Sequence, residues 1–170
     1  MGRSQLSLFE DKRVIQHGGS LSIGRRKNRR PLDVNKPIHL TLRSSQAIGP
    51  LSLRRFNGVI GSLAFALGVK WGVRIYSLNV NGNHLHLVIK IANRRCFQNF
   101  LRVFSGQISM KVRKADVRLD GKFWDFIPWT RIGEWGRAFK ILKGYVHQNE
   151  LEVTGVIPYQ PRGRKARLKS

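Results

Sequence analysis

The stretch that decides the predicted fold is GVRIYSLNVNGNHLHLVIKI, residues 72–91. Two runs of strand-forming residues flank Asn81-Gly82, a dipeptide typical of a tight β-hairpin because both residues tolerate positive φ. Alternation along the second run predicts a core-facing side formed by Leu85, Leu87, Ile89 and Ile91. The same alternation predicts an open side formed by His84, His86, Val88 and Lys90. We therefore expect a hairpin with two neighbouring imidazoles on its open face.

Periodicity before the hairpin predicts a strand and a helix. KPIHLTLR, residues 36–43, alternates as a strand with one solvent-facing side. His39 on that side is expected as a surface histidine, and an approach to the histidine pair in the same sheet is the alternative. Apolar residues then recur at spacings of three and four from Leu53 to Leu67, after a Gly49-Pro50 start. This spacing is typical of an amphipathic helix.

The chain after the hairpin predicts two more helices and one more strand. An apolar stripe from Phe97 to Ile108 indicates a helix. Residues 122–132 are aromatic and interrupted by Pro128, which favours a loop and a short edge strand. A last helix is expected from about Glu134 to Leu151. The order predicts an α+β, ferredoxin-like (split βαβ) antiparallel sheet with helices on one face, plus a C-terminal helix that carries Tyr145.

The composition is strongly basic. Thirty-two Lys and Arg against nine Asp and Glu in 170 residues give a formal net charge of +23, which makes nucleic acid the first candidate partner. No Asp or Glu occurs from Val34 to Ala115, and this counts against a nuclease that holds two metal ions with carboxylates. The single cysteine excludes an intramolecular disulfide and fits a reducing cytoplasm. No apolar run resembles a signal peptide or a membrane span, so no membrane association is expected.

Basic residues gather toward both ends. We expect residues 1–30 to form a flexible basic arm, residues 31–157 a single catalytic domain, and residues 158–170 a basic tail. Such arms suit a phosphate backbone, and solvated tails that only keep the protein soluble are the alternative. The side chains expected to contact nucleic acid are Arg25, Arg26, Lys27, Arg29, Arg30, Lys90, Arg94, Arg95, Arg162, Arg164, Lys165 and Arg167.

His84 and His86 are candidate metal ligands. Side chains two apart on a strand lie close enough to bind one divalent cation, and neutral imidazole is a good ligand for zinc, manganese and similar metals. Two ligands are too few for a tight structural site but suit an open catalytic site completed by water or a phosphate oxygen. A chance pair, or a weak phosphate contact, is the alternative for the bare His-X-His tripeptide.

The last helix adds a candidate nucleophile in GYVHQNELE, residues 144–152. Tyr145 and Asn149 are four apart, so they project from the same side of a helix. Asn149, or Gln148 beside it, is a candidate third metal ligand through a neutral oxygen. Tyrosine is a poor nucleophile at neutral pH unless a metal stabilises the developing charge. A half-buried helix aromatic with its hydroxyl in water is the alternative for Tyr145.

NGNHLHLVIK (81–90), the Phe-rich helix after it and GYVHQNELEVTG (144–155) together resemble a known family. They are similar to the single-tyrosine transposases of the HUH (histidine, hydrophobic, histidine) superfamily. The closest likeness is to REP-associated tyrosine transposases, bacterial proteins linked to repetitive palindromic DNA. The resemblance runs from about Lys36 to Ile157.

This resemblance implies a reaction and a site. His84 and His86 would hold Mg²⁺ or Mn²⁺ with Asn149 as third ligand, and Tyr145 would attack a DNA phosphate to give a 5′-phosphotyrosine and a free 3′-hydroxyl. The implied substrate is single-stranded DNA with a hairpin near the cleavage point, and the implied location is the bacterial cytoplasm, at the nucleoid. Relatives include monomers and homodimers that complete the site with a partner's tyrosine helix. Family members often have Asn-Pro where this chain has Asn149-Glu150, so the helix can continue and Gln148 becomes a rival ligand.

Two other functions compete with a DNA-cleaving enzyme. A protein on the same fold could bind DNA or RNA hairpins without cutting them, using only the basic surface. A basic RNA-associated structural protein is the third hypothesis, and it assigns no role to the histidine pair. Because the charge predicts nucleic-acid binding under all three, only the chemistry separates them.

Overall fold

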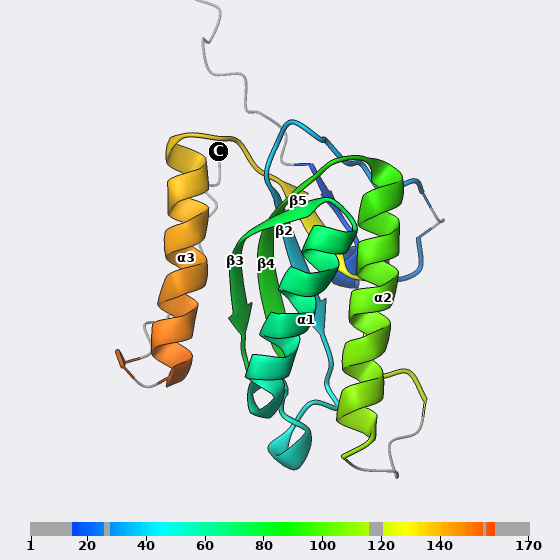
Figure 1. Cartoon of the computed structure of the whole chain (residues 1–170), viewed down its shortest axis with the longest axis vertical. Helices are drawn as coiled ribbons and strands as arrows, with labels where there is room; N and C mark the ends of the chain where they lie inside the picture. Colours follow the sequence, from blue (N-terminus) through cyan, green and yellow to red (C-terminus); the bar gives the residue numbers. More distant parts are fainter. Residues whose placement is uncertain (1–14, 26–27, 116–120, 155, 159–170) are drawn as a thin grey trace, which may run out of the picture.

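The computed structural model describes residues 15–25, 28–115, 121–154 and 156–158 (Figure 1). Five strands form one antiparallel sheet in the order β1-β5-β2-β4-β3. The strands are β1 (Gln16–His17), β2 (Ile38–Arg43), β3 (Val73–Val80), β4 (His84–Ile91) and β5 (Trp129–Ile132). The α-helices are α1 (Asn57–Lys70), α2 (Arg94–Arg113) and α3 (Arg137–Thr154), and short 3₁₀ turns occupy Gly19–Ser22, Gly49–Leu51 and Leu53–Phe56. The α+β class predicted from the sequence is confirmed.

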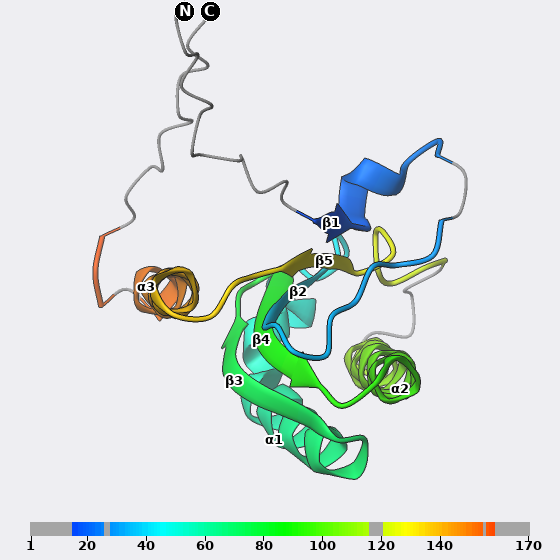
Figure 2. The same ribbon diagram turned by 90° about the horizontal axis from the view of Figure 1, so that it is seen from above.

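The helices divide between the two faces of the sheet. Helices α1 and α2 lie on one face, and α3 lies on the opposite side, against β3 and β4 (Figure 2). We call these the core face and the α3 face. No helix among the described residues is long and apolar enough to cross a membrane.

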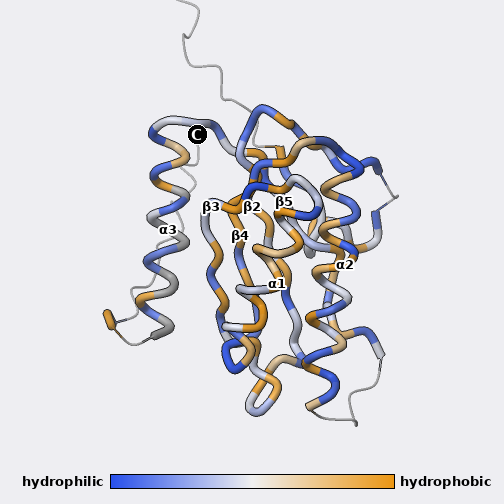
Figure 3. The backbone as a smooth tube through the Cα atoms, in the orientation of Figure 1, coloured by the Kyte–Doolittle hydropathy of each residue, from blue (hydrophilic) through white to orange (hydrophobic). Residues whose placement is uncertain are grey.

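The core fills the space between the sheet and α1 and α2. Alternate residues of β2 and β4 point into it, and three phenylalanines of α2 close it from the other side. In Figure 3 hydrophobic colour is concentrated where the sheet meets α1, whereas α3 carries much hydrophilic colour. The largest fully buried side chains are Phe97, Phe100, Phe104, Ile38, Leu40, Leu42, Leu53, Ile60, Leu85, Leu87, Ile89 and Ile91. These include the four apolar positions predicted for the core side of β4, so that prediction is confirmed.

Two local features fix the helices on the core face. Helix α2 begins where the Asn93 side chain accepts a hydrogen bond from the Cys96 N–H at 2.8 Å, a typical N-cap. Gly68 lets α1 approach β3 closely, because a Cβ at this position would lie 2.8 Å from the Val73 carbonyl oxygen.

The β3–β4 hairpin forms as predicted, but its turn differs from the expected one. Neither Asn81 nor Gly82 has a positive φ. The turn instead binds the segment before α1, because the Gly82 carbonyl accepts a hydrogen bond from the Leu53 N–H at 2.8 Å. This tertiary contact replaces the tight local turn that the dipeptide alone favours.

The sheet is larger than the sequence predicts. β5 was expected as an edge strand, but this is wrong, because it lies between β2 and β1. β1 pairs with β5 and belongs to the segment expected as an N-terminal arm. The last helix continues to Thr154, in agreement with the absence of proline after Asn149.

Candidate functional site

His84 and His86 lie next to each other on the α3 face of β4. Their ring centroids are 4.9 Å apart and the ring planes are nearly perpendicular, at 83°. The neighbouring apolar residues Leu85 and Leu87 point to the core face, so strand alternation alone accounts for the shared orientation of the two imidazoles. The structure thus brings together the two histidines predicted from the sequence.

Hydrogen bonds determine which nitrogen of His84 carries the proton. His84 Nδ1 lies 2.7 Å from Asn83 Oδ1, which can only accept, so Nδ1–H is the donor. The Asn81 Nδ2 amide, which can only donate, lies 2.7 Å from His84 Nε2. Burial, with the nearby Arg43 charge as a smaller cause, lowers the pKa of His84. The ring is therefore neutral at pH 7 and has its lone pair on Nε2, the form that binds metals.

His86 is held by two partners from β2. Its Nδ1 lies 3.0 Å from His39 Nε2 and 3.0 Å from Thr41 Oγ1. Metal-binding histidines usually have their second ring nitrogen fixed by such a hydrogen bond. These contacts therefore suit a histidine that presents Nε2 to a cation.

The expectation that His39 is a surface histidine is wrong. Only 6% of this residue is exposed, because the rings of His86 and Trp129 pack against it. Burial, with Arg131 adding a like charge, lowers the pKa of His39 to about 4. His39 is thus a buried neutral base in contact with His86 and with the edge of Trp129.

Two asparagines of the same hairpin were not predicted from the sequence as site residues. Asn79 and Asn81 are buried on the α3 face beside the histidines, and the side-chain oxygen of each has no hydrogen-bond partner. Among the described residues, no group of three or more His, Cys, Asp and Glu is placed to hold a metal ion. The ligands that the described residues offer beside the two imidazoles are neutral oxygens. These buried oxygens without partners and the two imidazoles fit a divalent cation. The alternation Asn-Val-Asn before the turn, matching His-Leu-His after it, is the signal that could have found them.

Helix α3 is attached to β3 by aromatic side chains. Tyr76 lies at the irregularity in the β3–β4 pairing and contacts both Trp135 and Phe139, with ring centroids 5.6 and 5.3 Å away. This contact fixes the N-terminal part of α3 on the histidine side of the sheet. Tyr145 and Asn149 belong to α3, but their side chains lie outside what the structure describes. The Gln148 amide donates to Glu152 within the helix at 3.0 Å.

An arginine-lined cavity of about 340 Å³ lies on the other side of the sheet. Its walls include Arg29, Arg30, Arg94 and Arg102, over a floor that contains Phe97. Arg30 donates to Thr130 Oγ1 at 2.7 Å, and Arg94 donates to the Arg30 carbonyl oxygen at 2.8 Å. Burial, with the neighbouring charge of Arg94, lowers the pKa of Arg30 to about 10. Arginines gathered in this way are suited to bind an anion such as phosphate.

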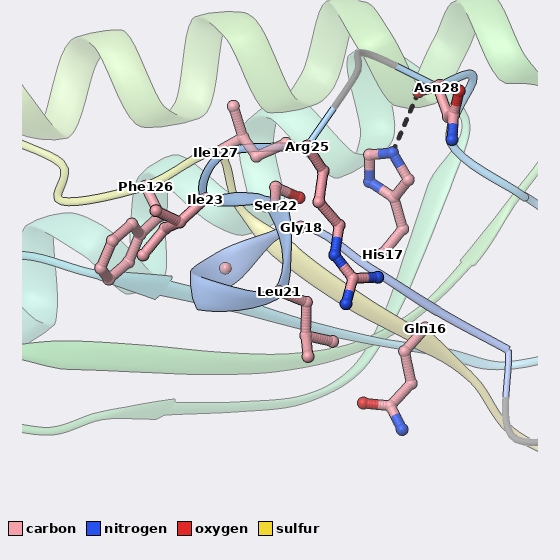
Figure 4. Close-up of a pocket in the computed structure, with 11 residues that line it drawn as sticks. Gln16, His17, Gly18, Leu21, Ser22, Ile23, Arg25, Asn28, Phe126 and Ile127 are labelled. Atoms are coloured by element: carbon pink, nitrogen blue, oxygen red, sulfur yellow. Dashed lines mark hydrogen bonds between the residues drawn. The ribbon is translucent and has the colours of Figure 1, made fainter.

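The other predicted nucleic-acid contacts are scattered. Arg25 lines a separate cavity of about 640 Å³ beside β1, shown in Figure 4, which contains neither His84 nor His86. Lys90 is half-buried on β4 and Arg95 is exposed on α2. The remaining predicted contacts lie outside the described residues: Arg26, Lys27, Arg162, Arg164, Lys165 and Arg167.

Comparisons with known proteins give no match by sequence and a distant likeness by structure. No family model matches the chain, and no curated protein matches it. Among solved structures, the chain is similar to a protein from Deinococcus radiodurans R1 described as a "putative transposase". The two are 13% identical, with a TM-score of 0.44, over 74% of this chain and 98% of the other. A likeness this distant carries no argument about function.

Proposed function

We propose that the chain is a metal-dependent enzyme that cleaves and rejoins single-stranded DNA next to hairpins, as a single-tyrosine transposase of the HUH type. The observation that carries the proposal is the location of α3. This helix, on which Tyr145 lies, packs against β3 and β4 on the face that presents His84 and His86 (Figure 2). A nucleophile and a metal site on facing elements suit phosphoryl transfer.

The proposal includes the ferredoxin-like plan. Without β1, the strand order is β5-β2-β4-β3, with α1 after β2 and α2 after β4. This order supports a split βαβ arrangement to which β1 and α3 have been added.

The histidines would hold Mg²⁺ or Mn²⁺, with Asn149 or Gln148 from α3 as third ligand. The neutral His84, with its lone pair on Nε2, supports this assignment, as does the fixed Nδ1 of His86. The bound cation would polarise the scissile phosphate and stabilise charge that develops during attack.

Tyr145 would perform the covalent step. Its phenol oxygen attacks the phosphorus atom, a bond forms between them, and the bond from phosphorus to the 3′-oxygen breaks. The tyrosine proton is lost to solvent and the departing 3′-oxygen takes up a proton, so charge and atoms balance. Reversal by a 3′-hydroxyl rejoins the strand, which distinguishes this chemistry from hydrolysis.

Basic side chains would hold the DNA backbone. The arginines of the 340 Å³ cavity, Arg29, Arg30 and Arg94, are the described residues best suited to a phosphate. Arg25, Lys90, Arg95 and the basic residues outside the described part of the chain would add contacts along the strand.

The test is covalent attachment to DNA. The full chain is incubated with labelled single-stranded hairpin DNAs and Mn²⁺ or Mg²⁺, then separated on a denaturing gel. We expect an adduct that disappears on chelation and with Tyr145→Phe, while DNA binding persists. Tyr76→Phe is the matched control, because Tyr76 makes ring contacts in the aromatic cluster, and it should keep the adduct. An adduct that survives Tyr145→Phe would assign the attack to another tyrosine.

A hairpin-binding protein without cleavage is the second candidate. The arginine cavity favours it, because that cavity lies on the core-face side of the sheet and does not involve the histidine pair. Tight binding of DNA or RNA hairpins with no adduct under any metal condition would establish this function in place of the enzyme.

A further inference from the structure

Two asparagines lie directly across the hairpin from the two histidines. The β3–β4 register pairs Asn79 with His86. The Asn81 N–H donates to the His84 carbonyl at 2.8 Å, so Asn81 faces His84 next to the turn. Opposite residues of an antiparallel pair have side chains on the same face. The four side chains therefore form a block of two imidazoles and two carboxamides on the α3 face.

The carboxamide oxygens of this block are buried and unsatisfied. Asn79 is 2% exposed and Asn81 is 4% exposed, and neither Oδ1 atom has a hydrogen-bond partner. A buried acceptor without a partner is rare and unfavourable, so its presence needs an explanation. Two such oxygens two residues apart, each opposite an imidazole, point to one shared positively charged ligand.

The Asn81 amide already has the spacing of a metal ligand. Its terminal nitrogen lies 2.7 Å from His84 Nε2, and neighbouring ligands in an octahedral shell with bonds of 2.0–2.1 Å lie about 3 Å apart. Rotation of the amide by half a turn exchanges Nδ2 and Oδ1. Without a cation, Nδ2–H donates to the Nε2 lone pair; with one, Oδ1 and Nε2 can both bind it.

We propose that Asn79 and Asn81 supply carboxamide oxygens to the divalent cation that the proposed function assigns to His84 and His86, an inference that rests on that function. The hairpin then provides four neutral ligands, two nitrogens and two oxygens, and leaves room for water or a phosphate oxygen in a six-coordinate shell. No Asp or Glu occurs between Val34 and Ala115, so these ligands leave the full charge of the cation to act on the phosphate. Helix α3 then supplies the tyrosine, and Asn149 or Gln148 would add a fifth ligand from the other side of the site.

The test is direct binding of Mn²⁺ to the full chain, measured from the electron paramagnetic resonance signal of the free ion. Asn79→Leu and Asn81→Leu remove the oxygens, whereas Asn79→Asp and Asn81→Asp keep an oxygen at each position. We expect each leucine variant to weaken Mn²⁺ binding about tenfold or more. The aspartate variants should bind at least as tightly as the original chain.

A fold control separates ligand loss from damage. In metal-free buffer, Asn79→Leu should melt at the same temperature as the original chain or higher, because it removes an unsatisfied buried oxygen. A leucine variant that melts lower but binds Mn²⁺ normally would mark the asparagines as structural and overturn the inference.

The outcomes also separate this inference from the proposed function. Unchanged Mn²⁺ affinity in both leucine variants, together with a DNA adduct at Tyr145, overturns the inference and leaves the enzyme intact. Weakened Mn²⁺ affinity in a chain that never forms an adduct supports the four-ligand site and overturns the tyrosine reaction. An original chain that binds no Mn²⁺ overturns both.

Discussion

Both faces of strand β4 contain buried side chains, but the two faces differ in chemistry. Toward α1 and α2, Leu87 is 0% exposed within a continuous apolar core. Toward α3, its neighbour His86 is 8% exposed, among imidazoles, a threonine and two asparagines. One face is closed by packing alone, and the other contains polar groups whose hydrogen bonds are incomplete.

This difference indicates that one face of the sheet stabilises the fold and the other is suited to bind a ligand. Burying apolar side chains stabilises the fold by about 25 cal/mol per Å², whereas burying polar groups costs free energy unless each is hydrogen-bonded. Burial of apolar side chains on the core face therefore offsets the free-energy cost of burying polar groups on the α3 face. A buried polar cluster of this kind is expected where a ligand, and not the folded chain alone, completes the contacts.

The largest expected loss of stability comes from a substitution on the core face. Leu87→Ala should lower the free energy of unfolding by about 2–5 kcal/mol, because it removes fully buried methyl groups and leaves a cavity. Lys90→Ala, on the other face of the same strand, should change stability by less than about 0.5 kcal/mol. Urea denaturation measures both. Equal effects would show that β4 does not separate a structural face from a functional one.

The next effect is the pH dependence of the α3 face. Burial lowers the pKa of His39 to about 4, whereas in the unfolded chain histidine titrates near 6.5. The unfolded state thus binds the proton more readily, and stability should fall as pH drops from 6.5 to about 4, by about 3 kcal/mol in total. Above pH 6.5 His39 should have no such effect.

Comparison with His39→Gln isolates this contribution. Urea titrations at several pH values in metal-free buffer should show a shallower loss of stability for the variant. Some loss should remain, since burial also lowers the pKa of His84. Parallel curves for the two proteins would mean that His39 is not a buried neutral base.

Local sequence patterns predicted the elements and one face of the sheet well. Strand alternation identified Leu85, Leu87, Ile89 and Ile91 as core residues, and helical spacing identified α1 and α2, because both signals depend only on residues close in the chain. The same alternation put His84 and His86 side by side. The α+β class follows from the order of these elements.

The burial of the α3 face could not be predicted in this way. His39 alternates like a solvent-facing residue, but it is buried against His86 and Trp129, which lie on neighbouring strands far along the chain. Helix α3 returns to the same face of the sheet, against β3 and β4. That return depends on contacts of Tyr76 with Trp135 and Phe139, about sixty residues apart in sequence. The turn at Gly82 and the strand β1 also depend on distant partners, Leu53 and β5.

The smallest expected effect comes from removing one hydrogen-bond partner of His86 on the α3 face. Thr41 Oγ1 and His39 Nε2 both lie 3.0 Å from His86 Nδ1, so each can replace the other as its partner. Thr41→Val should therefore cost only about 0.5–1.5 kcal/mol, the value of one hydrogen bond. With His39→Leu in the same chain, Nδ1 loses the contacts with both His39 and Thr41, and the cost should exceed the sum of the two single changes by about 0.5 kcal/mol or more. A double-mutant cycle in urea measures this excess. If the effects are additive, the two residues do not share Nδ1, and His86 is fixed in another way than these contacts indicate.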